Sequence, residues 1–316
     1  MRRKWQLNHL LTRVWRRICE SVLLVPIARL ALLNLYSRKR ITTPSGPVVS
    51  LTTYGKRLRT VYLTIESIAC GSVLPSRIVL WLDERAAYDH PPATLRRLQT
   101  RGLELRLCRN YGPHTKYYPY VASQDLFDVP MVIADDDILY PRWWLQALVE
   151  SSEQYPDTVN CCVAKTVELD EGGIARYDAW KIAASTQPSP RNIAHGVNGV
   201  IFPVPYMMAL KEAGDGFVSC CPKADDIWLH VQAIRAGYKI RQILPSARRF
   251  PAIPGTQEGG LWVYNNSVGN DQQVKATYSA EDIEILRGDR DLPQLSERRL
   301  SGVLKQREDG GSLIGP

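Results

Sequence analysis

The first half of the chain alternates between short apolar runs and amphipathic stretches. The apolar runs have the length of buried strands and cover residues 48–53, 77–82, 103–108 and 130–134. The amphipathic stretches have helical spacing and cover residues 59–70, 93–101 and 142–155. Strand and helix units that alternate at this length predict an α/β fold with a mostly parallel, doubly wound sheet.

The second half of the chain is less regular. Its pattern predicts a strand within residues 196–202, a helix over 224–236 and a strand over 239–244. Residues 41–47 have the composition of a linker, and the polar, Gly-rich residues 291–316 are predicted to form a loose tail. We therefore expect one folded domain over residues 47–290.

Residues 1–40 carry an amphipathic pattern of their own. Between residues 5 and 25, apolar side chains fall on one helical face and polar ones on the other. A transmembrane helix, which needs about 20 apolar residues, is not expected because Pro26 and Arg29 interrupt the stretch. A signal peptide is not expected either, because no small-residue cleavage site precedes the basic residues 38–40. The pattern favours an amphipathic segment at a membrane interface, and a helix packed on the protein's own core is the alternative.

The net charge of +8 is concentrated in this N-terminal segment. Residues 1–40 hold ten basic side chains and one acid, whereas the other 276 residues hold 30 basic and 31 acidic groups. The main domain is near neutral, which argues against nucleic acid as a partner. The basic segment instead predicts an anionic membrane surface as a partner and a peripheral location on the cytoplasmic face of the cell membrane.

The seven cysteines form an odd set without any Cys-x-x-Cys pair. This usage is typical of reduced thiols in a cytosolic protein. A zinc site built from Cys220, Cys221 and His230 is not expected, because their spacing differs from that of zinc ligands.

The clearest chemical signal is a run of three acids, Asp135, Asp136 and Asp137, directly after the apolar run at 130–134. Carboxylates this close repel one another unless a cation compensates them. They follow a strand, and open α/β sheets bind ligands at the carboxyl ends of their strands. Oxygen ligands suit Mg²⁺ or Mn²⁺, so the run predicts a metal site, with a solvated acidic loop as the alternative.

A second acidic pair, Asp225 and Asp226, opens the amphipathic helix predicted over residues 224–236. Acids at a helix N-terminus have an ordinary role, since they cap the helix and complement its dipole. Two acidic sites in one domain also permit a division of labour, in which one holds a metal and the other accepts a proton.

Four stretches, taken in order along the chain, point to a known family. They are VVSLTTYGKRLRTVYLTIESI, RIVLWLDE, IADDDILYP and ADDIWLHVQAIRAGYKI. They resemble the first strand with its nucleotide-binding turn, the second strand with its terminal acid, the D-x-D motif and the "ED" helix of GT-A-fold glycosyltransferases. The arrangement is close to that of the family 2-like bacterial enzymes of surface polysaccharide synthesis, and the resemblance covers roughly residues 47–280. It implies a GT-A fold.

For the donor side, the resemblance implies a nucleotide pocket lined by Thr52, Thr53 and Tyr54, with Asp83 on the base or ribose. Family members usually show Asp-Asp-x-Ser after the second strand, whereas this chain has WLDER. The nucleotide contacts therefore depart from the family pattern at this point.

For the reacting centre, the resemblance implies that Asp137 binds the metal and that Asp135 binds the metal or the ribose. Asp136 between them is grouped with the donor-binding residues. Asp226 matches the general base of inverting members, and Asp225 is its acidic neighbour.

For the acceptor side, the stretch HGVNGVIFP resembles the loop below the acceptor, which places His195, Gly196 and Gly199 there. Trp180 is a further candidate, because an aromatic ring can stack on the C–H face of a sugar, and core packing is its alternative.

Two further pairs are candidates from their residue types alone. His114 and Lys116, in YGPHTKYYP, are candidates for contact with the diphosphate, and a solvated loop is the alternative. Asn270 and Asp271 are predicted either to cap a helix or to contact phosphate or metal.

Together, these features predict a metal-dependent, inverting transfer of a sugar from a nucleotide-sugar to a glycan or lipid-linked glycan. Mn²⁺ or Mg²⁺ would be the cofactor. One alternative is a nucleotidyltransferase, although the turn after the first strand has only Gly55 in place of a Gly-rich loop. The other is a non-catalytic, membrane-associated scaffold, against which the intact acids at both sites argue.

Overall fold

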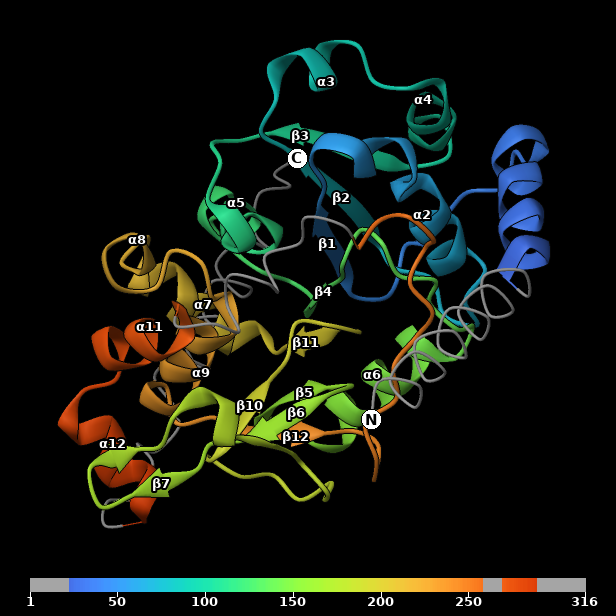
Figure 1. Cartoon of the computed structure of the whole chain (residues 1–316). Helices are drawn as coiled ribbons and strands as arrows, with labels where there is room; N and C mark the ends of the chain where they lie inside the picture. The colour runs from blue at the N-terminus through green and yellow to red at the C-terminus, as the bar shows by residue number, and fades with distance from the viewer. Residues whose placement is uncertain (1–22, 258–268, 289–316) are drawn as a thin grey trace, which may run out of the picture.

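Figure 1 shows the chain as a computed structural model, which describes residues 23–257 and 269–288 of the 316. A central sheet of seven strands lies between two layers of helices. The predicted α/β fold with a mostly parallel sheet is confirmed. Most of the amphipathic pattern predicted over residues 5–25 and the loose tail predicted over 291–316 lie outside the described residues.

The sheet has the strand order β12-β5-β11-β4-β1-β2-β3. Its strands are β1 (Val48–Thr52), β2 (Arg77–Leu82), β3 (Leu103–Leu107), β4 (Met131–Ile133), β5 (Thr158–Cys161), β11 (Val200–Phe202) and β12 (Lys239–Gln242). β1, β2, β3 and β4 run parallel to one another, as do β5 and β12. β11 runs antiparallel between β4 and β5, which the sequence pattern did not predict.

This antiparallel strand determines where the site forms. Val200, the first residue of β11, pairs with Ile133, the last residue of β4. The loop that leads into β11 therefore reaches the same edge of the sheet as the acids that follow β4. Asp135 and Gly196, about 60 positions apart in sequence, both lie next to the Lys116 ammonium group as a result.

Two helical layers cover the sheet because side chains alternate between its faces along each strand. On β1, Val49 and Leu51 point to a cluster with the helices α2, α4 and α6, whereas Val48 points to a cluster with α5, α7 and α9. The first layer comprises α2 (Val61–Ala69), α4 (Ala93–Gln99) and α6 (Trp144–Gln154). The second comprises α5 (Tyr118–Ser123), α7 (Val204–Ala213), α8 (Phe217–Cys220), α9 (Asp225–Arg235) and α11 (Asn270–Thr277).

The remaining elements are short. The helix predicted over 59–70 is present as α2, and a 3₁₀ turn η1 (Gly55–Arg59) precedes it. The other short helical elements are α3 (Arg85–Asp89), η2 (Gly112–Lys116), η3 (Tyr177–Ala179) and α12 (Ala280–Arg287). Two small sheets are formed by β6 (Ala164–Thr166), β9 (Lys181–Ile182) and β10 (Asn192–Ala194), and by β7 (Leu169–Asp170) and β8 (Gly173–Ile174).

A helix over residues 23–36 packs on the outside of this body, beside α2 (Figure 1). Its Leu30 forms an apolar cluster with Leu63, Leu139 and Ile253. The alternative that the N-terminal segment packs on the domain therefore holds for one face of this helix. Within the described residues, no helix combines the length and the apolar character needed to cross a membrane.

A hydrogen bond from this helix to a buried ion pair of the domain connects the two. Glu66 on α2 is 1% exposed and pairs with Arg101, which is 5% exposed. Asn34 of the N-terminal helix donates a hydrogen bond to Oε1 of Glu66 at 3.1 Å. The acceptor atoms of Glu66 are thus satisfied by groups from two other parts of the chain, as a buried carboxylate requires.

Removing one partner of this ion pair should destabilise the fold strongly. We expect Arg101→Met to lower the free energy of unfolding by about 3–5 kcal/mol, because Glu66 becomes an uncompensated buried charge. The double variant Glu66→Met/Arg101→Met should recover a large part of that loss. Arg106→Met, which removes an exposed partner of Glu104, is the control and should cost about 0.2–1 kcal/mol. Urea denaturation followed by circular dichroism measures all three, and an Arg101→Met loss no larger than the control's would contradict the expectation.

Candidate active site

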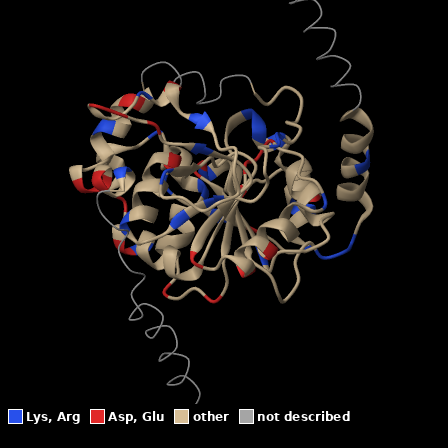
Figure 2. Ribbon diagram, turned by 90° about the horizontal axis from the view of Figure 1, so that it is seen from below, with Lys and Arg blue, Asp and Glu red and all other residues tan. Residues whose placement is uncertain are grey.

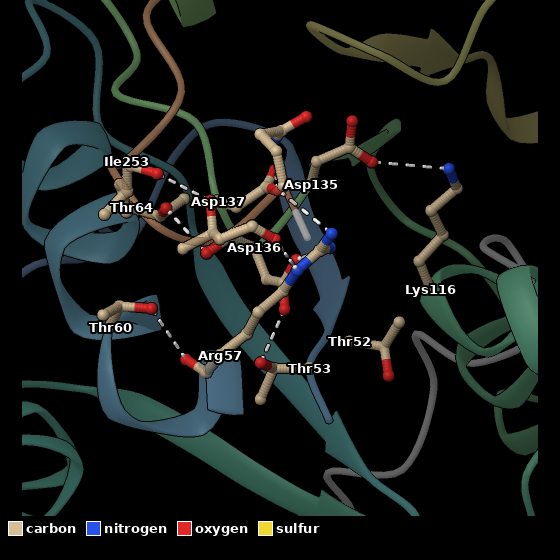
Figure 3. A network of polar contacts seen from close by, with 12 residues as sticks. Thr52, Thr53, Arg57, Thr60, Thr64, Lys116, Asp135, Asp136, Asp137 and Ile253 are labelled. Atoms are coloured by element: carbon tan, nitrogen blue, oxygen red, sulfur yellow. Dashed lines mark hydrogen bonds and ion pairs between the residues drawn. The ribbon is translucent and has the colours of Figure 1, made fainter. Parts of the chain in front are cut away.

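The acids after β4 lie at the carboxyl edge of the sheet, in contact with the turn that follows β1 (Figure 3). Asp136 and Asp137 are each 4% exposed. The hydroxyl of Thr53 donates to Oδ2 of Asp136 at 2.6 Å, and the hydroxyl of Thr64 donates to the Asp136 carbonyl at 3.0 Å. The acids are therefore held by β1 and α2, and they do not form the solvated loop that was the alternative.

Arg57 supplies the positive charge that allows two of these acids to be buried. Its Nη1 lies 2.9 Å from Oδ1 of Asp136, and its Nη2 lies 3.3 Å from Oδ2 of Asp137. The amide of Gln257 also donates to Oδ2 of Asp137, at 2.7 Å. Burial nevertheless raises the pKa of Asp137 to about 6, although Arg57 acts to lower it. The site thus still favours additional positive charge next to Asp137.

Lys116 joins the two acidic sites that the sequence pointed to. Its Nζ lies 3.6 Å from Oδ1 of Asp135 and 3.0 Å from Oδ2 of Asp225. Burial would lower the pKa of Lys116, but Asp225 and Asp135 outweigh it and raise that pKa. The Ser50 hydroxyl on β1 donates to the Lys116 carbonyl at 2.7 Å, which fixes the lysine at the sheet edge.

Asp226 lies in the same cluster, against the loop that leads into β11. The backbone N–H of Gly196 donates to Oδ1 of Asp226 at 2.8 Å. Nδ1 of His195 lies 3.6 Å from Oδ2, and Nε2 of His195 lies 3.2 Å from the hydroxyl of Tyr177. Burial, followed by the negative charge of Asp225, raises the pKa of Asp226 to about 7. Burial also lowers the pKa of His195 to about 4, so His195 is neutral at physiological pH.

Gly196 has no side chain for a steric reason. A Cβ at this position would fall against Nζ of Lys116 and 3.2 Å from Oδ1 of Asp226. With any other residue here, the Lys116 ammonium group would have to move away from the loop backbone. Gly199 has a different role, because its φ of +104° and a Cβ position 2.7 Å from the Trp144 ring tie it to core packing.

The residues predicted for the nucleotide pocket lie around the ends of β1 and β2. Thr52 donates to the Trp81 carbonyl at 3.1 Å, so its hydroxyl is engaged within the sheet. Tyr54 is 48% exposed and its ring lies 5.7 Å from the Arg57 guanidinium carbon. Asp83 accepts a hydrogen bond from the side chain of Asn110. The exposed ring of Tyr54 is the part of this set that is most available to a nucleobase.

Two sequence candidates are engaged elsewhere. His114 is fully buried, with its ring nitrogens 2.9 Å from the Tyr117 hydroxyl and 2.7 Å from the Cys221 carbonyl, so it is not available to a diphosphate. Trp180 is 3% exposed and donates to the Ala175 carbonyl at 3.0 Å, which is the packing alternative.

Asp271 holds the Tyr177 loop. Its Oδ1 accepts a hydrogen bond from the backbone N–H of Tyr177 at 2.8 Å. Its other oxygen lies 3.7 Å from Nε of Arg176. Its neighbour Asn270 is buried at the first position of α11. Asp271 therefore acts on the site through Tyr177 and His195.

Cys220, Cys221 and His230, whose spacing argued against a zinc site, each have other hydrogen-bond partners in the described part of the chain. Nδ1 of His230 is hydrogen-bonded to the Tyr278 hydroxyl, and Nε2 of His230 lies 2.8 Å from the Pro190 carbonyl oxygen. The six cysteines between residues 23 and 257 are all free thiols.

The acidic cluster suits a divalent cation that arrives with a phosphate ligand. Within residues 23–257 and 269–288, no three His, Cys, Asp or Glu side chains could hold a metal by themselves. Mg²⁺, however, is commonly bound by one or two carboxylates together with substrate phosphates. Four carboxylates share two basic groups, Arg57 and Lys116, in these ion pairs, so negative charge is in excess among them. Asp135 and Asp137 therefore fit such a cation.

Sequence reasoning missed two residues of this site. Arg57 is one of three basic residues in KRLR, and nothing in that run distinguishes it. Tyr177 lies three positions before Trp180 in the sequence. Its hydrogen bond to His195 depends on how η3 and β10 pack together, which the sequence does not indicate.

No protein-family model and no curated protein sequence matches the chain. Among solved structures, it is similar to the mannosyltransferase PcManGT from Pyrobaculum calidifontis in complex with GDP-Man and Mn²⁺. The identity is 16% and the TM-score 0.48, over 92% of this chain and 84% of that one. It is also similar to GalNAc-T7 with UDP, GalNAc and Mn²⁺, at 12% identity and a TM-score of 0.47, over 83% and 58%.

A third similar structure is a CMP:2-keto-3-deoxy-manno-octonic acid synthetase complexed with CTP. The identity is 12% and the TM-score 0.39, over 62% of this chain and 88% of that one. Scores and identities at this level describe general architecture, and they carry no residue role or activity from those proteins to this chain.

The pKa of Asp226 can be tested without any substrate. We expect a carboxyl titration near pH 7 by NMR, because burial and Asp225 favour the protonated form. In Asp225→Asn the midpoint should fall, since removing a neighbouring negative charge makes the ionised form easier to reach. Asp178→Asn removes an exposed acid, with a side chain 66% exposed, and should leave the midpoint unchanged. A wild-type midpoint near 4, or one that Asp225→Asn does not lower, would refute the assignment.

Proposed function

We propose that this protein is a metal-dependent, inverting glycosyltransferase with a GT-A fold, which moves a sugar from a nucleotide-sugar to a hydroxyl of a glycan or lipid-linked glycan. The observation that carries the proposal is the bridge made by Lys116. It brings the strand-end acids and the acids of α9 together within one cluster, through Asp135 at 3.6 Å and Asp225 at 3.0 Å. A reaction that needs a cation site and a proton acceptor side by side can use this arrangement.

The donor side of the proposal uses the turn after β1 and the acids after β4. The exposed ring of Tyr54 offers a stacking surface for the nucleobase, and Asp83 lies at the end of the neighbouring strand. Lys116 and Arg57 offer positive charge to the diphosphate. Mn²⁺ or Mg²⁺, bound by Asp135 and Asp137 with the donor phosphates, would supply further positive charge to the leaving diphosphate.

The acceptor side uses Asp226 as general base. Its ionised carboxylate takes the proton of the acceptor hydroxyl while that oxygen forms a bond to the anomeric carbon. The bond from the anomeric carbon to the diphosphate breaks on the opposite face, so the nucleoside diphosphate leaves and the configuration inverts. A pKa of about 7 suits this role, because the base is then ionised near neutral pH without being too weak.

His195 and Gly196 would position the base. The Gly196 N–H fixes one carboxylate oxygen at 2.8 Å. The neutral His195, held by Tyr177, lies next to the other oxygen. The Gly196 hydrogen bond restricts rotation of the Asp226 carboxylate, and a fixed orientation favours general base catalysis.

The base assignment predicts the effect of one substitution on turnover. Asp226→Asn should lower turnover about 10²–10⁴-fold, the usual contribution of a general base, and should leave donor affinity almost unchanged. The wild-type rate should rise with pH through about 7, as Asp226 ionises, and the residual rate of Asp226→Asn should lack that limb. Steady-state kinetics against pH measures both, with Asp178→Asn as the exposed-acid control. Retention of the donor's anomeric configuration in the product would exclude the single displacement.

The metal assignment predicts a nucleotide-binding result. A nucleoside diphosphate should bind measurably tighter with Mn²⁺ or Mg²⁺ than with EDTA, and Asp137→Asn should remove that difference. Isothermal titration calorimetry measures the affinities, and a screen of nucleotide-sugars for slow donor hydrolysis identifies the donor. Full turnover in excess EDTA would disprove metal dependence.

The same screen separates the rival functions. A nucleotidyltransferase would release pyrophosphate from a nucleoside triphosphate and a sugar, and would not hydrolyse nucleotide-sugars. A scaffold would bind no nucleotide under either condition.

A further inference from the structure

The helix over residues 23–36 has two apolar faces, and only one of them is covered. The inner face packs on the domain through Leu30, with Leu23, Ile27 and Leu33 partly buried beside it. The outer face consists of Leu24, Val25, Leu32, Leu35 and Tyr36, which are 63%, 76%, 56%, 50% and 73% exposed.

The residues of the outer face form a continuous stripe. Leu24, Leu32 and Tyr36 are spaced by multiples of four residues, and Val25 and Leu35 lie beside them on the helix surface. Single exposed apolar side chains are ordinary on soluble proteins, but a stripe of five on a short helix indicates an interaction surface. Within the sheet and its two helical layers, nothing comparable is exposed on one element.

Basic residues flank this stripe. Arg29 on the helix and residues 38–40 directly after it are basic and exposed, and residues 21–40 contain no acid. In Figure 2, the helix lies at the outside of the molecule with a single blue band, followed by a blue stretch of chain. The sequence adds six more basic residues and one acid before position 21.

We propose that the outer face of helix 23–36 is a docking surface for an anionic lipid bilayer, with its apolar side chains in the headgroup–acyl boundary. An apolar stripe flanked by Lys and Arg combines the two signals that hold peripheral proteins on anionic membranes. A second copy of this chain is a poorer occupant, because it would bring two strongly basic segments against each other, whereas anionic headgroups neutralise them.

The inner face fixes how the docked molecule is oriented. Leu30 belongs to the same apolar cluster as Leu139, two residues after Asp137, and Ile253, whose backbone N–H donates to the Asp137 carbonyl at 2.7 Å. A helix lying between the bilayer and this loop has a diameter of roughly 10 Å. Docking therefore places the acidic cluster close above the lipid surface. Whether the acidic cluster acts on a lipid-linked acceptor at the membrane rests on the proposed function. The docking of the helix on the bilayer does not.

The experiment measures how the full chain distributes onto vesicles. The test variant is Leu24→Gln/Leu32→Gln/Leu35→Gln, which leaves the inner face intact. The matched control is Leu126→Gln/Ile182→Gln/Val218→Gln, which replaces three side chains of similar exposure, at 50%, 47% and 46%, on other elements. Each protein is sedimented with phosphatidylcholine vesicles and with vesicles that also contain phosphatidylglycerol. Thermal denaturation and sedimentation velocity are recorded for each.

Wild type and control should bind the anionic vesicles, bind the neutral vesicles less, and lose affinity as salt is raised. The outer-face variant should bind the anionic vesicles at least about tenfold more weakly, with an unchanged melting temperature. If the outer-face variant binds the anionic vesicles as tightly as the wild type, the proposal is overturned and binding is assigned to residues before the helix. A wild-type dimer that becomes a monomer in the variant, without vesicle binding, would overturn it in favour of a second copy. Neither result depends on whether the chain transfers sugars.

Discussion

The ion pairs of Lys116 with Asp135 and Asp225 are the interaction on which the candidate site depends. They connect residues from the strand edge at β4 and the helix start at α9, which no backbone hydrogen bond joins directly. Without a cation between them, the carboxylates of these two elements would repel each other across a buried space. The carbonyl of Lys116 is in turn anchored to β1 by Ser50, so the lysine is fixed from both ends.

The direction of one strand explains why these groups meet. Because β11 runs antiparallel to β4, the loop before it arrives at the edge where the acids after β4 lie. That loop contributes the Gly196 N–H and the His195 ring, which face the Asp226 carboxylate. A uniformly parallel sheet would place the start of β11 at the opposite edge, and Asp226 would lose both neighbours.

The sequence predicted the parts of the molecule with strong local signals. The strands β1 to β4 and the helices α2, α4, α6 and α9 were predicted to within a few residues, because apolar runs and helical periodicity are both local properties. The small strands β6 to β10 escaped prediction, since two or three residues carry too short a pattern. The direction of β11 also escaped, because pairing partners lie far apart in sequence.

In the candidate site, too, the residues with a local sequence signal were predicted and the others were not. The acids Asp135, Asp137, Asp225 and Asp226 were found from their runs. The structure places Asp135, Asp225 and Asp226 near Lys116, and it pairs Asp137 with Arg57. Arg57 was missed because the sequence does not indicate which acid a long, flexible side chain in a basic run will pair with. Trp180 and His114 were proposed from residue type, and their burial shows why type alone is a weak guide when the environment is unknown.

For preparing the protein, the inner face of helix 23–36 has a practical meaning. Trimming the first 40 residues, a common way to improve expression, would bare Leu63, Leu139 and Ile253 and take Asn34 from Glu66. A shortened version should therefore start before residue 23.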